Sequence, residues 1–282
     1  MIDWILEPFQ QSFNQRAVLA ALLIGFTNGY ASAFVVLKKS ALKVGSLSHA
    51  LLPGIAVAIL LVGLHDWSAF VGALFAALLI GLGSLAVSRG SRLDHDSALA
   101  ILYTAAFSGG IILLRRLGVT QEMDEWLFGN IMGLRDSDLW TNFWISFGAL
   151  GILTALHRPL LMTLFDAEVA ATLGVPVRLL NYLLLAVLII VLISSLQAVG
   201  CMLALGLLVT PAATIYLLTD STNALFWGGA LLGGAAATAA VVIGWHLNLE
   251  QGPTIVLVLG AVFLLAFLFG PKYGLIARMR VR

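Results

Sequence analysis

Long apolar runs, separated by short polar stretches, follow one another along almost the entire chain. They occupy residues 17–37, 44–64, 68–87, 97–114, 139–156, 179–196, 198–218, 224–245 and 254–269. A helix needs about 20 apolar residues to cross a hydrocarbon core of about 30 Å. The sixth and seventh runs are separated only by a hairpin near residues 197–200. The pattern therefore predicts an all-α, polytopic membrane protein with about eight or nine transmembrane helices, forming one transmembrane domain over residues 1–282.

The first residues have a different pattern, with apolar side chains at helical spacing and polar residues between them. This spacing predicts a short helix over about residues 1–15, lying on the membrane surface before the first span and bent by Pro8. The apolar positions are Ile2, Ile5, Leu6, Phe9 and Phe13.

The basic residues are distributed unequally between the two sides of the predicted membrane domain. If the N-terminus lies outside, eleven of the fifteen Lys and Arg residues fall in loops and a tail on the cytoplasmic side. Cytoplasmic loops carry such an excess in membrane proteins. The charge pattern therefore predicts an inner-membrane protein with its N-terminus outside and its C-terminus in the cytoplasm.

Two segments between the runs are too long to be simple turns. Residues 115–138 lie on the predicted outer side and include an acidic cluster, Glu122, Asp124 and Glu125. Residues 157–178 lie on the inner side and contain a predicted short helix, which Asp166 caps and Gly174 and Pro176 end. A short helix across the cytoplasmic face is suited to docking another protein.

Composition and motifs exclude several classes of function. The net charge of +1 argues against nucleic acid as a partner, and Cys201 alone cannot form a multi-cysteine metal cluster. The chain has no phosphate-binding G-x-x-x-x-G-K-[ST] loop and no H-E-x-x-H or nucleophile-elbow motif. These absences predict a protein that is not an enzyme and does not bind ATP itself.

The stretch KVGSLSHALLPGIAVA places a histidine at the head of an apolar run. Pro53 has no N–H to donate to the carbonyl of His49, so residue 49 offers both an imidazole and an unpaired oxygen. Ser46 and Ser48 add hydroxyl groups nearby, and these groups suit a divalent transition metal. The alternative is structural: Ser46 caps a kinked helix that hides a hydrogen-bonded histidine.

Further polar or helix-breaking residues lie in or beside other runs. His246 and Glu250 would share a helix face, and could receive a cation, if the helix continues that far; otherwise they belong to an ordinary polar loop. Pro211 kinks the seventh run, either to line a transport path or only to shape the helix. His65, His95 and His157 are expected to be solvated residues at the ends of spans.

Four segments in order give the chain a recognisable pattern: KKSALKVGSLSHALLPG, FDAEVAATLGVPVRLLN, LQAVGCMLALGLLVTPAAT and LEQGPTIVLV. In these segments the chain resembles the permease subunits of manganese, zinc and iron ABC importers. The resemblance implies a fold similar to a shortened vitamin B12 importer permease. It also implies a second permease copy, cytoplasmic ATPase subunits that bind ATP, and an external metal-binding protein, with the metal as transported substrate and no permanent cofactor.

The resemblance also assigns roles to segments and exposes one departure. Residues 165–174, including Phe165, Asp166, Glu168 and Gly174, match the family's ATPase-coupling helix, and 115–138 would meet the binding protein. Family members usually carry an aspartate four residues before the histidine, where this chain has Gly45. Losing a carboxylate favours zinc slightly over manganese. The alternative function is a secondary metal transporter driven by an ion gradient.

Overall fold

The structure, a computed structural model, describes residues 12–63, 66–119, 127 and 129–276. These residues form helices and connecting loops without a strand, which confirms the predicted all-α class. The described elements are α2 (Ser12–Leu37), α3 (Ala41–Val62), α4 (Asp66–Gly90), α5 (His95–Leu117), the 3-10 turn η2 (Ile131–Gly133), α7 (Asp136–Ala155), α8 (His157–Phe165), α9 (Ala167–Thr172), α10 (Val177–Val199), α11 (Cys201–Tyr216), α12 (Thr222–Leu247) and α13 (Gln251–Phe269).

Each of the nine predicted apolar runs corresponds to a helix in the described residues. By length and apolar composition, six of these helices can cross a membrane: α2, α4, α5, α10, α12 and α13. A seventh span results if α7 and α8, which meet at an angle of 64°, are taken together. The two remaining runs, in α3 and α11, contain shorter apolar stretches at residues 49–62 and 204–216.

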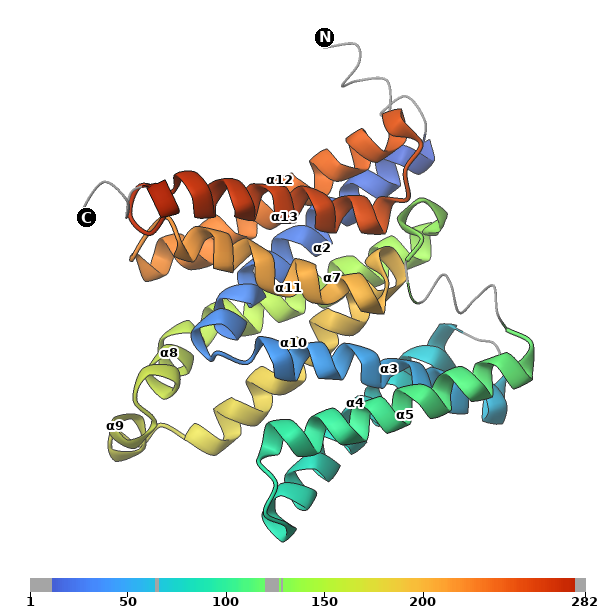
Figure 1. Ribbon diagram of the computed structural model, residues 1–282, viewed down its shortest axis with the longest axis horizontal. Coiled ribbons are helices and arrows are strands. Elements are labelled where there is room, and N and C mark those ends of the chain that lie inside the picture. Colours follow the sequence, from blue (N-terminus) through green and yellow to red (C-terminus); the bar gives the residue numbers. More distant parts are fainter. Residues whose placement is uncertain (1–11, 64–65, 120–126, 128, 277–282) are drawn as a thin grey trace.

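Glycines bring α2 and α12 into the most extensive helix contact of the molecule (Figure 1). A Cβ atom at Gly29 would overlap the backbone of Gly229, and one at Gly25 would lie 2.5 Å from the carbonyl oxygen of Gly233. Small residues at such spacing let two backbones approach closely where lipid supplies no hydrophobic driving force. The contact makes α12, which is rich in glycine and alanine, an interior helix of the described bundle.

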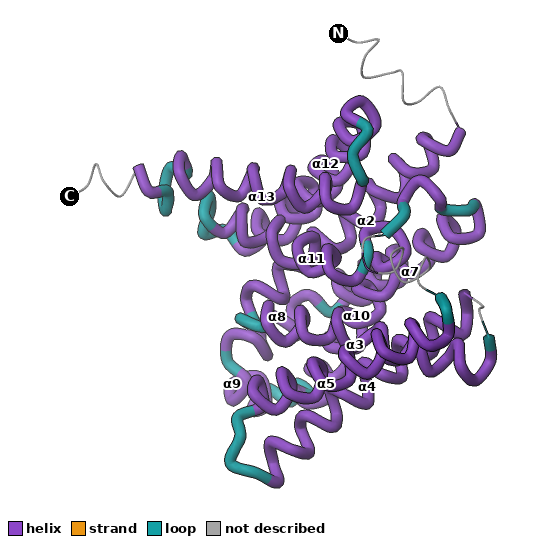
Figure 2. The backbone as a smooth tube through the Cα atoms, turned by 45° about the vertical axis from the view of Figure 1, so that its right-hand side comes forward, coloured by secondary structure: helices purple, strands orange, loops and turns teal. Residues whose placement is uncertain are grey.

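A second group of helices, α3, α4 and α5, lies beside the first (Figure 2). Gly54 of α3 and Gly72 of α4 face each other so closely that neither position has room for a side chain. Gly110 of α5 packs on Pro53 of α3, where an added Cβ would lie 2.7 Å from the proline Cα. Because α11 packs on α3 as well as on α2, α12 and α13, it joins the two groups.

The break between α10 and α11 is shorter than the predicted hairpin at residues 197–200. α10 continues to Val199, and the single buried residue Gly200, with a φ of +81°, separates it from Cys201. Pro211 lies inside α11, as predicted, and the N–H of Ala212 donates to the hydroxyl of Ser32 on α2 at 3.1 Å. This bond ties the proline-containing helix to the central pair.

Two boundaries differ from the sequence-based predictions. Of the predicted surface helix at residues 1–15, the first eleven residues lie outside the described part of the chain, and the rest form the beginning of α2. The segment at 157–178 contains two helices instead of one, because α8 precedes α9. Phe165 is the last residue of α8 and does not belong to the short helix that follows.

Candidate ion route and docking segment

His49 lies in α3 with its ring against two aromatic side chains of α5. The ring stacks on Tyr103 with centroids 5.8 Å apart and an interplanar angle of 21°, and it meets Phe107 edge-on at 5.3 Å. Its Nδ1 atom is buried and has no hydrogen-bond partner among the described residues. A buried imidazole nitrogen without a partner is costly, so the structural alternative of a hydrogen-bonded core histidine loses support on this side of the ring.

Gly45, four residues before His49, is packed against α11. Gly45 is buried, and a Cβ atom there would lie 2.8 Å from Cδ2 and 3.3 Å from Cδ1 of Leu205. Leu205 thus fills the space that a larger side chain at residue 45 would need. Ser46 is half-buried one turn before His49, and Ser48 lies in the same helix, though its side chain is outside the described structure.

α12 does not continue far enough for His246 and Glu250 to share a helix face, so the structure favours the alternative of a polar loop. α12 ends at Leu247, and Asn248 adopts the left-handed conformation with a φ of +51°. Glu250 is instead the N-cap residue of the next helix, α13, and is exposed, whereas His246 is half-buried at the end of α12. The sequence carried a signal for this break, because asparagine, like glycine, often adopts the left-handed conformation that ends a helix.

No group of three or more His, Cys, Asp or Glu side chains that could hold a metal ion occurs in the described residues. His49 and His246 also belong to different helix groups, because α3 packs on α4, α5 and α11, whereas α12 packs on α2, α11 and α13. Within one chain, the described candidate ligands therefore do not form a closed metal cage.

The short helix α9 forms as the sequence predicted. The carboxylate of Asp166 accepts hydrogen bonds from the N–H groups of Glu168, at 3.1 Å, and Val169, at 2.9 Å. At the other end, Gly174 has a φ of +80°, and its N–H donates to the carbonyl of Ala171 while that of Val175 donates to Ala170. This pair of bonds is the Schellman arrangement, which requires a residue tolerant of positive φ.

The outer face of α8 and α9 exposes a row of apolar side chains. Phe165 is 69% exposed and Leu173 is 63% exposed. Met162 before them and Val169 between them are exposed as well. The opposite face is buried, with Ala170 fully covered. Figure 1 places α8 and α9 together at one end of the molecule, so this row forms an apolar surface there.

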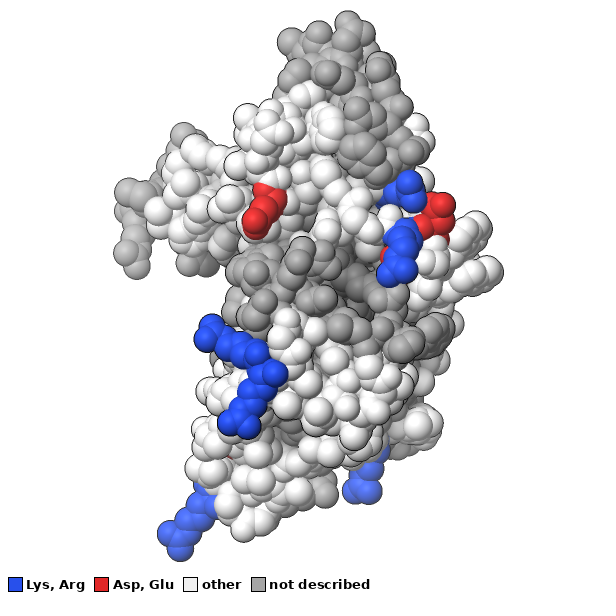
Figure 3. All heavy atoms as spheres, turned by 90° about the vertical axis from the view of Figure 1, so that its right-hand side faces the viewer, with Lys and Arg blue, Asp and Glu red and all other residues white. Residues whose placement is uncertain are grey.

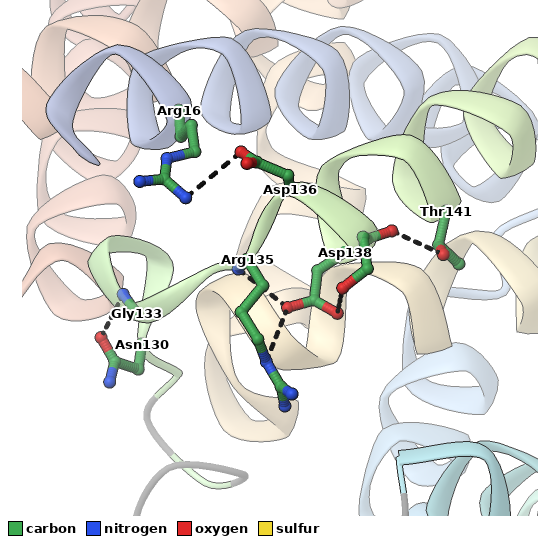
Figure 4. Close-up of polar contacts among 8 residues, drawn as sticks. Arg16, Asn130, Gly133, Arg135, Asp136, Asp138 and Thr141 are labelled. Atoms are coloured by element: carbon green, nitrogen blue, oxygen red, sulfur yellow. Dashed lines mark hydrogen bonds and ion pairs between the residues drawn. The ribbon is translucent and has the colours of Figure 1, made fainter. Parts of the chain in front are cut away.

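The loop before α7 is held by charged contacts (Figure 4). Arg16 at the start of α2 pairs with Asp136 at the start of α7 at 3.2 Å, and the carboxylate of Asp138 accepts from the backbone N–H of Arg135 at 2.9 Å. The predicted binding-protein contacts Glu122, Asp124 and Glu125 lie outside the described residues. Elsewhere the face in Figure 3 carries few charges on a mostly uncharged surface.

His157, expected to be solvated, instead lies in an aromatic cluster at the start of α8. Its Nδ1 lies 3.2 Å from the hydroxyl of Tyr30, and its ring meets Phe226 edge-on with centroids 4.6 Å apart. The partners come from α2 and α12, far away in sequence, so no local pattern indicates them. Pro159 in the first turn is a signal for a helix start that could have revealed α8.

Comparison with known proteins connects this architecture to membrane transport. The manganese transport system membrane protein MntC of Halalkalibacterium halodurans is 37% identical over 269 residues, which cover 95% of this chain and 90% of that protein. A probable iron transport system membrane protein of Haemophilus influenzae is 31% identical over 278 residues, 99% of this chain and 97% of that protein.

A solved structure and a family model agree with these relatives. A chain of PsaBC from Streptococcus pneumoniae in complex with Fab is similar with a TM-score of 0.89 and 31% identity, covering 97% of this chain and 98% of that one. The model of the ABC 3 transport family matches residues 10–270. The resemblance drawn from the four sequence segments is thereby confirmed, and the chain belongs to the ABC 3 transport family.

Proposed function

We propose that this chain is the permease subunit of an ATP-driven importer that moves a divalent transition metal from an external binding protein into the cytoplasm. The observation that carries the proposal is the similarity, over nearly the full length, to proteins named for manganese and iron transport. The unpartnered Nδ1 of His49, one turn before Pro53 inside α3, supports a metal as the cargo.

The cargo is manganese, iron or zinc. An imidazole and main-chain oxygen are acceptable to all three ions, and Ser46 and Ser48 would add hydroxyl oxygen. Gly45 under Leu205 supports a slight preference for zinc, because a site without that carboxylate loses more affinity for the harder manganese ion. His246 and Glu250, separated by the break at Asn248, would act only as individual groups at the entrance.

ATP would bind and be hydrolysed on a partner subunit, while this chain is not an enzyme and holds no permanent cofactor. The apolar surface of α8 and α9, including Phe165, with Asp166, Glu168 and Gly174 setting the shape of α9, would dock in the ATPase. Movement of that segment would switch the route past His49 between outward and inward states. Pro53 and Pro211 would let their helices bend in this step.

The protein would lie in the inner membrane with its N-terminus outside, as the distribution of Lys and Arg supports. A second permease copy would complete the route between the two chains, giving a homodimer. The acidic loop with Glu122, Asp124 and Glu125 would face the external binding protein.

The alternative, a secondary transporter driven by an ion gradient, receives less support. Such proteins carry acidic residues inside the membrane domain. In the described residues every acidic residue lies at a helix end or in a loop: Asp66, Asp94, Asp96, Asp136, Asp138, Asp166, Glu168, Asp220 and Glu250. An exposed apolar docking surface on α8 and α9 would also have no role in that mechanism.

Uptake into sealed vesicles tests the proposal. Vesicles holding this chain with its co-purified ATPase are supplied with Mn²⁺, Fe²⁺ or Zn²⁺ and the binding protein, with ATP or a non-hydrolysable analogue. Uptake of at least one ion only with hydrolysable ATP is expected. Uptake that follows an imposed proton or sodium gradient without ATP would establish the secondary transporter instead.

A further inference from the structure

The α8–α9 segment packs on the rest of the molecule mainly through one face of α8, and α9 adds a smaller contact with α10, where Ala170 is fully buried. The buried residues of α8, Leu160 and Thr163, follow His157 at intervals of three, so all three lie on one side of the helix. Leu160 is fully buried, and Thr163 donates its hydroxyl hydrogen to the carbonyl of Leu160 at 2.8 Å. The opposite side of α8 carries Met162 and Phe165, which are exposed.

His157 stands at a bend of 64° between α7 and α8. α7 ends at Ala155, and α8 leaves it at 64°, so the first residue of α8 is the pivot between a long helix and the segment that leads to α9. Because the His157 ring is in contact on several sides, it fixes the direction of α8 relative to α7.

The contacts of His157 are made with the central helix pair. Its ring packs edge-on against Phe226 of α12 and, at 6.3 Å, against Phe34 of α2. Its Nδ1 shares a hydrogen bond of 3.2 Å with Tyr30 of α2, whose side chain is 2% exposed. Tyr30 in turn packs on Phe226 at 5.1 Å and on Trp227 at 5.2 Å.

The central helices α2 and α12 cannot separate locally when α8 shifts against them. α2 and α12 are in backbone contact at Gly25, Gly29, Gly229 and Gly233, close in sequence to Tyr30 and Phe226. Packed elements of this kind move as units and do not deform continuously. A shift of α8 is therefore passed to both helices together through the aromatic cluster.

We propose that the His157–Tyr30 contact is the positioning link through which movement of α9 reaches the membrane helices. His157 touches no cargo; it sets the orientation of α8 relative to α2 and α12 through one directional polar bond within an apolar cluster. This inference rests on the proposed function, in which α9 docks on the ATPase.

The test uses the assembled permease–ATPase complex in proteoliposomes and measures metal ions transported per ATP hydrolysed. Tyr30→Phe removes only the hydroxyl and keeps every ring contact, and His157→Phe removes the nitrogen while keeping an aromatic ring. Each is expected to lower the transport ratio about fivefold or more, the size of a typical coupling between two sites. ATPase activity and co-purification are expected to remain.

Three controls separate transmission from stability. Tyr182→Phe makes the same change on an exposed side chain of α10 and should leave the ratio at the wild-type value. His157→Asn offers an amide oxygen near the position of Nδ1 and should recover part of the ratio. The transport ratio of the Tyr30→Phe, His157→Phe double variant should be no lower than that of the poorer single variant, because both substitutions remove the same hydrogen bond.

A wild-type ratio in Tyr30→Phe and His157→Phe would overturn the inference. So would a loss of transport that only follows the loss of thermal stability or of assembled complex, which would make the contact merely structural. These outcomes differ from failure of the proposed function, in which the wild-type complex itself would transport no divalent metal with ATP.

Discussion

His49 combines a polar atom and an apolar setting in a way that packing alone does not explain. Tyr103 and Phe107 cover its ring, yet its Nδ1 is buried without a partner in the described residues. Such atoms are rare because each one forfeits hydrogen bonds that water would have provided. The residue is therefore the best point at which to test the transport route by substitution.

His49→Ala is expected to lower ATP-dependent metal uptake by about tenfold or more, since changes even beside a metal ligand often cost that much. Initial uptake rates in vesicles measure the effect. Assembly with the ATPase is the control and should be retained, because His49 lies far along the chain from the α8–α9 surface. Thermal stability is measured beside it, since the substitution also removes the ring contacts with Tyr103 and Phe107. Uptake at the wild-type rate would remove His49 from the route.

At the scale of the element, glycines decide which helices can be neighbours. The pair Gly29–Gly229 and the pair Gly54–Gly72 each leave no room for a side chain, and each joins two helices of one group. Other glycines in the helices, such as Gly148 in α7, have nothing within 4 Å of an added Cβ. The two kinds of position predict opposite responses to the same substitution.

Gly29→Ala is expected to reduce the free energy of unfolding by about 1–3 kcal/mol, because the new methyl group meets backbone that cannot rotate away. Gly148→Ala, the matched control, should change stability by no more than about 1 kcal/mol and in the favourable direction, since alanine is the better helix former. Thermal and denaturant unfolding in detergent compare the two. Equal stability of both variants would contradict the close packing of α2 on α12.

The short helix α9 is defined by local signals at both ends. It lies outside the predicted membrane spans, yet it and the residue after it expose apolar side chains such as Val169 and Leu173. Leu173→Glu is expected to abolish co-purification of the ATPase without lowering thermal stability, because the side chain is exposed and makes no buried contact to lose. Leu249→Glu, an exposed leucine between α12 and α13, is the matched control. Normal ATPase association of the Leu173 variant would place docking elsewhere.

At the scale of the whole molecule, a polar cluster joins the segment after α13 to the loop before α12. Lys272 donates to the carboxylate of Asp220 at 2.6 Å, and the hydroxyl of Tyr273 donates to the same group at 2.9 Å. The hydrogen bond from Lys272, followed by that from Tyr273, lowers the pKa of Asp220. The same bond raises the pKa of Lys272.

The stabilisation from this cluster therefore depends on pH. The lowered pKa of the Asp220 carboxyl contributes stability that is present above the unfolded pKa of about 4 and is lost as the pH falls through the folded pKa. The raised pKa of Lys272 contributes stability that is present below the unfolded pKa of about 10 and is lost as the pH rises through the folded pKa. Asp220→Asn should lower the melting temperature slightly at pH 7, and the difference from the wild type should shrink as the pH falls below about 4. Melting curves across this range measure it, and a difference that persists in acid would contradict the assignment.

Local physics allowed the sequence to predict much of this protein. In lipid, backbone polar groups must be satisfied within the helix, so apolar runs alone determined the helices and the all-α class. The cap at Asp166 and the end at Gly174 were also predicted, because both depend on backbone bonds within a few residues. The four ordered segments identified the family.

Only the tertiary structure decided which side chains meet. Nothing near His157 in the sequence indicates Tyr30 or Phe226, and nothing near Gly45 indicates Leu205, because these contacts join helices that are remote along the chain. His246 and Glu250 separated because the backbone turned left-handed at Asn248 before a shared face could form. Helix formation follows from neighbouring residues, whereas the partners of a side chain follow from how whole helices pack.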